Sequence, residues 1–295
     1  MEVHSELSSH GGSQPEPHSV EHRGWRLTCT KGPMAGAQDL DELSAALGPH
    51  ELPPLPEIIF AANSLSLHHH ASGFALRFRA EGGLRVWAER SAAHGAQGVT
   101  VPVASSAAWK EKAAAYAKRD PVRDYDWTYT ADYMGEAMRG DEEAAWAPHT
   151  GDGIDMAMLK RTDLPILAFT DMVLFTDDLH DCGESELRLR LRLMPDCFFI
   201  LLRHFLRVDG VFIRTHDTRI FHKFGTDAVI RATRLAQAPL PPLPSVAAAA
   251  TPSPGPPRGS PLSTCATALP NEAEAAQRLA AIPSVCEAVE EIRLS

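Results

Sequence analysis

Long apolar runs are missing from this sequence. No run approaches the roughly 18 residues that a membrane-spanning helix requires. The first 22 residues also lack the apolar segment that a secretory signal peptide carries. We therefore expect no membrane partner and a cytoplasmic or nuclear location.

Cysteine is scarce, and its spacing excludes two common classes of small domain. The five cysteines are odd in number and widely separated, and no two of them form a CxxC pair. A disulfide framework and a zinc knuckle both require closer or paired spacing. We interpret these residues as reduced intracellular thiols: Cys29, Cys182, Cys197, Cys265 and Cys286.

Sequence motifs for catalysis and nucleotide binding are also missing. The chain contains no GxSxG elbow, no HExxH pair, and no GxGxxG or GxxxxGK[ST] loop. The formal charge of -10 produces a field that repels a phosphate backbone, so nucleic acid is not an expected partner. A length of 295 residues is nevertheless ample for a substantial core.

The rest of the chain is predicted to pack on residues 185–224, the stretch densest in apolar and arginine residues. Leucines at 187, 189, 191 and 193 alternate with Arg188, Arg190 and Arg192. This period of two is that of a half-buried strand with one apolar face and one basic face.

The next run, residues 197–208, does not alternate, and its apolar residues share a broad arc at 100° per residue. This pattern favours an amphipathic helix that begins after Asp196 and ends at Gly210. The competing interpretation joins the run to the following strand as a hairpin through Asp209-Gly210, which is a two-residue turn signal.

Residues 211–224 return to strand character around a polar centre, the RTHDTR run from Arg214 to Arg219. A second unusual stretch is YDWTYTADYMG at 125–135, which reads as a strand with Tyr125, Trp127 and Tyr129 on one face. Polar groups set into otherwise apolar strands suggest a working surface, although a structural ion pair and core aromatics explain them as well.

Further elements follow from shorter patterns. We expect helices over 39–47, 105–118 and 155–160 and two near the end of the chain, the first capped by Asn271 with Glu274. Strands are expected at 25–30, 58–60, 65–67, 74–78, 84–87 and 165–175. The fold class is α+β, a mostly antiparallel sheet with flanking helices in a single domain.

Composition divides the chain into four parts. Residues 1–22 are too polar to offset their ordering entropy and are expected to be disordered. The domain covers 23–235. Residues 236–264 form a flexible insert, because nine of the 23 prolines lie between Pro239 and Pro261. Residues 265–295 supply terminal helices that pack on the domain.

Two clusters invite a metal. His68, His69 and His70 are consecutive, so they cannot all face one ion. The turn at 177–181 contains Asp177, Asp178, His180 and Asp181, but Leu179 stands where a calcium loop needs a ligand. A solvated acidic turn is the preferred interpretation; the alternative is a metal-dependent hydrolase that uses this turn.

Five strings resemble one known family. They are LPEIIF at 55–60, SGFALRF at 72–78, YDWTYTADYMG at 125–135, ILAFTDMVLFTDDLHDCG at 166–183, and MPDCFFILLRHFLRVDGVFIRTHDTRIFHKF at 194–224. Together they are similar to the TIPRL family, the TOR signalling pathway regulator-like proteins. The resemblance runs from about Trp25 to Arg234, with His204 in place of a typical aromatic residue.

This resemblance implies a non-catalytic regulator, without cofactor or metal, that binds and restrains catalytic subunits of type 2A serine/threonine phosphatases in TOR signalling. A Tap-type regulatory subunit is a further implied partner. Carried over to this chain, the polar and aromatic positions of the two signature strings form the expected partner-binding surface: Asp126, Trp127, Tyr129, Asp132, Arg214, Asp217 and Arg219.

Overall fold

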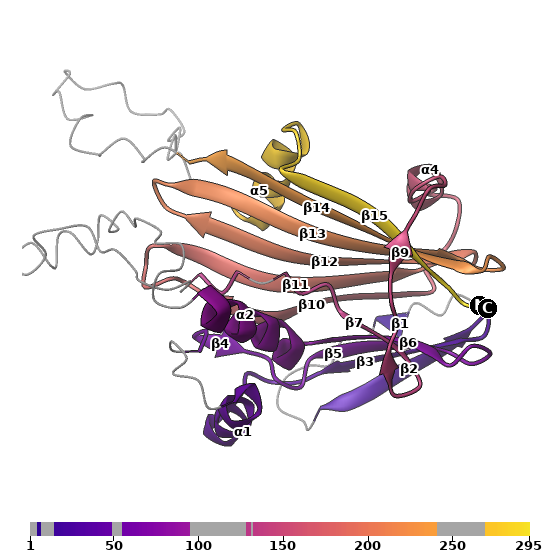
Figure 1. Cartoon of the computed structure of the whole chain (residues 1–295), viewed down its shortest axis with the longest axis horizontal. Coiled ribbons are helices and arrows are strands. Elements are labelled where there is room, and N and C mark those ends of the chain that lie inside the picture. Colours follow the sequence, from indigo (N-terminus) through magenta and orange to yellow (C-terminus); the bar gives the residue numbers. More distant parts are fainter. Residues whose placement is uncertain (1–4, 7–14, 49–54, 95–127, 131, 241–268) are drawn as a thin grey trace, which may run out of the picture.

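The computed structural model describes residues 5–6, 15–48, 55–94, 128–130, 132–240 and 269–295. Within these ranges the chain forms two β-sheets and four helices (Figure 1). All strand pairs are antiparallel except that between the first strand and β10. The predicted α+β class, with mostly antiparallel sheet and flanking helices, is confirmed.

Sheet A is the larger sheet. Its strands run in the order β1-β10-β11-β12-β13-β14-β15-β9, and β4 pairs with β10 beside β1. Its strands are β1 (Ser5–Glu6), β4 (Ile58–Ile59), β9 (Ala147–Pro148), β10 (Ala168–Asp177), β11 (Gly183–Leu193), β12 (Cys197–Val208), β13 (Phe212–Lys223), β14 (Ala228–Pro239) and β15 (Cys286–Arg293).

Sheet B has six strands in the order β2-β3-β5-β6-β7-β8. They are β2 (Glu16–His22), β3 (Trp25–Lys31), β5 (Ser64–His69), β6 (Phe74–Arg79), β7 (Glu136–Arg139) and β8 (Glu142–Glu143). The helices are α1 (Ala37–Leu47), α2 (Ala80–His94), α4 (Met156–Leu159) and α5 (Glu272–Ala280). Figure 1 shows α4 and α5 on the side of sheet A that faces away from sheet B.

The two sheets bury one common core between them. Trp25 of β3 is fully buried and meets Phe198 of β12 edge to face, with ring centroids 5.0 Å apart. Leu67 of sheet B and Leu189 of sheet A belong to the same apolar cluster. Because burying each large apolar side chain stabilises the fold by about 1.5–3 kcal/mol, this layer is the main source of stability.

The prediction of a helix at 197–208 is wrong, and the competing hairpin is correct. These residues form β12, which pairs residue for residue with β13 through a turn at Gly210, where φ is +75°. The run does not alternate because β12 is covered on both faces. Phe198 faces sheet B, while Phe205 lies in a second apolar cluster with Leu279 of α5.

Two other segments have the opposite type of structure from that predicted. Residues 84–87 lie in helix α2 instead of a strand, because Leu84, Trp87 and Ala88 form one buried helical stripe. The last element, predicted to be a helix through Ile292, is strand β15, which satisfies the backbone edge that β14 would otherwise expose.

Two segments that were expected to be disordered form strands in the parts that the structure describes. Within the first 22 residues, Glu16–His22 form β2 and pair with β3 along their whole length. Within the expected insert, residues 236–239 complete β14, and Leu240 donates its N–H to Val211. Residues 241–268 lie outside the described ranges, as does the helix expected at 105–118.

The remaining elements agree with their sequence patterns. The alternating leucines and arginines form β11, and the capping box of Asn271 and Glu274 begins α5. Asp155 accepts a hydrogen bond from the N–H of Met158 and begins α4. The strand predicted for YDWTYTADYMG is absent from its described part: residues 128–130 and 132–135 form no strand, and Tyr129 has a φ of +55°.

Candidate functional site

The RTHDTR run lies on β13, where successive side chains point to opposite faces of sheet A. Arg214 and His216 face the layer shared with sheet B, where His216 stands across from His204 of β12. Asp217 and Arg219 point to the outer face, toward α5. The predicted surface is therefore divided between two faces of one sheet.

Asp217 is almost completely buried, with 3% of its side chain exposed. Its two carboxylate oxygens accept hydrogen bonds from Arg203 on β12 at 2.6 and 2.8 Å, and one of them also accepts from Arg219 at 2.9 Å. Burial opposes ionisation, but the hydrogen bonds and charge of Arg203 outweigh it and lower the pKa of Asp217. The carboxylate thus holds two arginines in place and has little surface left for a partner.

The network continues into helix α5 through Glu272. One carboxylate oxygen of Glu272 accepts from Arg203 at 2.6 Å, and both accept from Arg190 of β11, at 3.1 and 2.8 Å. Burial opposes ionisation here as well, yet the hydrogen bonds from Arg190 and Arg203 lower the pKa of Glu272 to about 2. The basic stripe predicted on β11 is therefore real, and much of its charge is neutralised within the chain.

The remaining candidates lie on the inner face of sheet A or near it. Asp132 is exposed, and its carboxylate lies 3.5 Å from a guanidinium nitrogen of Arg90 and 4.0 Å from Nδ1 of His216. Arg214 donates to the side-chain oxygen of Gln237 at 2.9 Å. Tyr129 is buried, with its ring 5.1 Å from that of Trp87, and so is placed as a core aromatic. Asp126 and Trp127 lie outside the described residues.

The inner face also contains a buried chain of polar groups that sequence patterns did not indicate. The hydroxyl of Ser185 donates to the carbonyl oxygen of Thr128 at 2.7 Å and lies 3.1 Å from Nε2 of His204. Since the serine proton is used by Thr128, Nε2 of His204 is the donor in the second bond. Burial lowers the pKa of His204 to about 3, so the ring is neutral, and its buried Nδ1 has no hydrogen-bond partner among the described residues.

The outer face of sheet A also carries an open groove of about 300 Å³, here called the outer groove. Its residues are Met156, Leu159, Lys160, Phe169, Arg190, Leu191, Arg192, Phe199 and Leu201. Phe169 and Met156 are 44% and 47% exposed, which is unusual for side chains of their size. The lining contains three cations and no carboxylate, although the whole chain has a net charge of -10.

Two of the groove's cations keep their charge available. Arg192 donates to the carbonyl oxygen of Leu159 at 3.1 Å, and in the described part of the chain neither it nor Lys160 has a carboxylate within ion-pair distance. Arg190 instead is held by Asp171 and Glu272. An apolar floor with a basic rim is suited to a segment that combines bulky apolar side chains with carboxylates.

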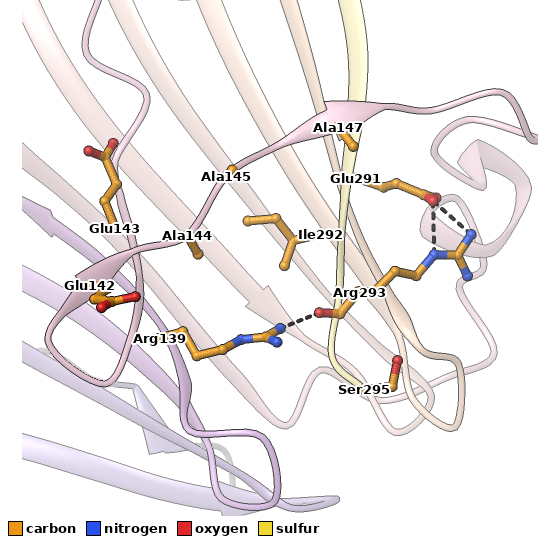
Figure 2. A pocket seen from close by; sticks show the side chains of 10 residues that line it. All are labelled: Arg139, Glu142, Glu143, Ala144, Ala145, Ala147, Glu291, Ile292, Arg293 and Ser295. Carbon is orange, nitrogen blue, oxygen red and sulfur yellow. Dashed lines mark hydrogen bonds and ion pairs between the residues drawn. The ribbon is translucent and has the colours of Figure 1, made fainter.

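A second cavity of about 480 Å³ lies between β7–β8 and the end of β15 (Figure 2). Its lining combines three alanines and Ile292 with charged residues of both signs, among them Arg139 and Glu142. In Figure 2 the guanidinium of Arg139 points to the backbone oxygen of Arg293, and the guanidinium of Arg293 is turned toward Glu291. Both arginines are thus engaged within the chain, and this cavity offers a partner less than the outer groove does.

In the acidic turn at 177–181, two of the carboxylates accept hydrogen bonds from backbone N–H groups of the chain. Asp177 accepts the N–H groups of Glu57 and Leu179, at 2.8 and 2.7 Å, and Asp178 accepts that of His180. Leu179, His180 and Asp181 have left-handed backbones that these bonds support. No group of three or more potential ligands capable of holding a metal occurs among the residues with described positions. The hydrolase alternative therefore gains no support here.

No helix among the described residues is long and apolar enough to cross a membrane.

The sequence is similar to known proteins over most of its length. Residues 58–242 match the sequence model of the TIP41-like family. A TIP41-like protein of Rattus norvegicus is 35% identical over 232 residues, which is 78% of each chain. Its Homo sapiens counterpart is 36% identical over 208 residues, 70% of this chain and 72% of that protein.

A relative in Saccharomyces cerevisiae is named type 2A phosphatase activator TIP41. It is 29% identical over 237 residues, which is 73% of this chain and 62% of that protein.

Proposed function

This chain belongs to the TIP41-like family, and on that premise we propose that it is a non-catalytic regulator which binds the catalytic subunit of a type 2A serine/threonine phosphatase. The names of the Saccharomyces cerevisiae and Schizosaccharomyces pombe relatives, both type 2A phosphatase activators, support the class of partner. We further propose that binding restrains the phosphatase and that the protein acts in TOR signalling.

The outer groove is the observation that carries this proposal. It combines two exposed bulky side chains, Phe169 and Met156, with a basic rim on an otherwise acidic protein. Such a patch is costly to leave in water and is typical of a surface that another protein covers. Apolar anchors supply most of the binding energy in such interfaces, while the cations select the partner and orient it.

The predicted partner-binding residues take different parts in this proposal. Arg219, which is one third exposed, extends the basic outer face. Asp217 acts indirectly, because it positions Arg203 and Arg219. Arg214 and Asp132 lie on the opposite side of the sheet, so a partner that also reaches them must extend around the edge of the sheet toward α2. Tyr129 acts indirectly, as a core aromatic packed on Trp87 of α2.

The proposed surface can be tested with two matched substitutions. Phe169→Asp places a charge in the outer groove. Met34→Asp places the same charge at another exposed bulky residue, which is 57% exposed and precedes α1 in the sequence. Binding to a purified type 2A catalytic subunit is measured by biolayer interferometry at 150 mM salt. We expect F169D to weaken binding at least tenfold, about 1.4 kcal/mol, and M34D to change it less than twofold.

Equal affinities for the two variants would contradict the placement of the interface, and no binding by the unmodified chain would contradict the proposed function. A phosphopeptide assay with increasing amounts of the chain then fixes the direction of the effect. Falling phosphatase activity is expected. A rise would keep the partner but overturn the restraint. Repeating the titration with a Tap-type regulatory subunit shows whether a third protein joins the complex.

A further inference from the structure

Helix α5 is attached to the outer face of sheet A mainly through arginines. Arg190 and Arg203 bind Glu272, the first residue of the helix, and Arg207 donates to the carbonyl oxygen of Pro270 just before it. At the other end, Arg234 donates to the carbonyl oxygens of Leu279 and Ile282. A helix of nine residues is marginal in isolation, so these contacts determine whether it stays folded and docked.

The apolar contact beneath α5 is small. Ala275 and Leu279 are fully buried, and they pack on Phe205, Ile213 and Ala236 of the sheet. These two side chains bury little apolar area, so their burial stabilises the docked helix only modestly. The charged bonds at its first residue are therefore a considerable part of what holds the helix in place.

Arg190 takes part both in the outer groove and in the attachment of α5. Its guanidinium lines the outer groove, and the same group binds Glu272 through both terminal nitrogens while its Nε donates to Asp171. A carboxylate that entered the groove and approached Arg190 would meet nitrogens already in use. A partner that engages this arginine must displace a carboxylate of the protein itself.

From this geometry we propose that Glu272 is a built-in competitor for the outer groove: it occupies Arg190, a groove arginine that a carboxylate of the bound partner would engage, so that docking of α5 and binding of an acidic partner weaken each other. This inference rests on the proposed function for the identity of the partner. Coupling of this kind is reciprocal, and the partner loosens α5 by the same factor by which docked α5 weakens the partner.

The competitor is tested by Glu272→Gln, which keeps the shape of the side chain and removes its charge. The control is Glu274→Gln in the same helix, because Glu274 completes the capping box and contacts no arginine of the sheet in the described structure. We expect E272Q to bind the phosphatase catalytic subunit three- to tenfold more tightly than the unmodified chain, and E274Q to bind within twofold. If both variants tighten binding equally, helix docking matters but the charge of Glu272 does not, which overturns the proposal.

A measurement on the unmodified chain avoids any effect of substitution on folding. Hydrogen exchange of the amides of α5 is followed with and without the bound catalytic subunit. Exchange that accelerates several-fold on binding supports the competition. Unchanged or slower exchange overturns it.

A synthetic probe separates this inference from the proposed function. A fluorescein-labelled hexapeptide of alternating leucine and glutamate is titrated against the unmodified chain and E272Q. Tighter binding to E272Q supports the competitor even if the phosphatase does not bind, in which case only the proposed function fails. If the peptide binds both chains equally, or binds neither, the competitor fails whatever the phosphatase does.

Discussion

Asp217→Asn is the substitution that most directly separates a structural carboxylate from a partner-binding one. The change preserves size and removes one negative charge. In the folded chain that charge faces Arg203 through two hydrogen bonds of 2.6 and 2.8 Å and Arg219 through one of 2.9 Å. The amide oxygen of asparagine can replace one carboxylate oxygen and accept its bonds, but the amide nitrogen is a donor and is placed against an arginine N–H in the position of the other oxygen.

The expected loss of stability follows from burial. Removing one partner of a buried ion pair typically costs about 3–5 kcal/mol, because the remaining charge stays buried. Arg203 still has Glu272 at 2.6 Å, so it is not left without a counter-ion. We therefore expect the lower end of the range, about 3 kcal/mol, which corresponds to a fall in Tm of about 6–12 °C for a chain of this size.

Thermal unfolding at pH 7 measures this loss, and Asp163→Asn is the matched control. Asp163 also binds an arginine through both oxygens, to Arg161 at 3.0 and 2.6 Å, but is 65% exposed. Solvent screens exposed pairs, which contribute little to stability, so D163N should hardly change Tm. If D217N is no more harmful than D163N, the buried-pair reasoning is refuted. Weakened phosphatase binding with unchanged Tm would instead place Asp217 in the interface.

Two other features give predictions of their own. His149 has a raised pKa because its Nε2 bonds the carbonyl of Asp152 and its Nδ1 bonds Glu291. A raised pKa means that its stabilisation is complete below the unfolded value of about 6.5 and is lost as pH rises through the folded pKa. The protection of the amides of residues 144–152, which is the exchange rate corrected for its intrinsic rise with pH, should therefore fall between mildly acidic and alkaline pH, and His149→Gln should abolish that fall. Gly135→Ala should cost about 1–3 kcal/mol more than Gly140→Ala in thermal unfolding. Both glycines have positive φ, but a Cβ at Gly135 would lie 2.3 Å from the Phe78 ring, whereas nothing lies within 4 Å at Gly140. Equal losses of stability would show that the strain of a positive φ, and not the contact with Phe78, determines the cost of the substitution.

The sequence predicts the fold class and most strands because alternation is a local signal. Where a strand has one solvated face, as in β11, leucine and arginine alternate and the period is clear. Where both faces are covered, as in β12, apolar residues occur on both faces and the period disappears. Whether helices will cover the second face depends on segments that are distant in sequence, which a local pattern does not contain.

The errors at α2 and β15 have different physical causes. In α2 two glycines interrupt the apolar pattern that would indicate a helix, and close packing requires glycine at both positions. A Cβ at Gly82 would lie 2.7 Å from the hydroxyl of Tyr133, and one at Gly83 would lie 2.7 Å from the side chain of Leu187. In β15 the spacing of Ala288, Val289 and Ile292 fits a helix, but the open edge of β14 requires a strand. Tertiary pairing overrides local propensity there.

The candidate site was only partly predictable for the same reasons. The strand assignment of the RTHDTR run already implies that Arg214 and Asp217 face opposite ways, since their positions differ by an odd number. The basic stripe of β11 was visible in the alternation. The exposure of Phe169 was not visible in the sequence, because the residue lies in an apolar run that is typical of a buried strand.

The outer groove is best understood as an apolar cluster that this chain leaves incomplete. Leu159 and Phe199 belong both to the groove and to the cluster that α4 forms with Met194, Cys197 and Phe221. Helix α4 has only four residues and covers one end of that cluster, while α5 covers a separate cluster. Between them the sheet presents aromatic surface with cations at its border. A partner segment that fills this gap would extend an existing core, so its apolar side chains would gain the same burial that holds α4 in place.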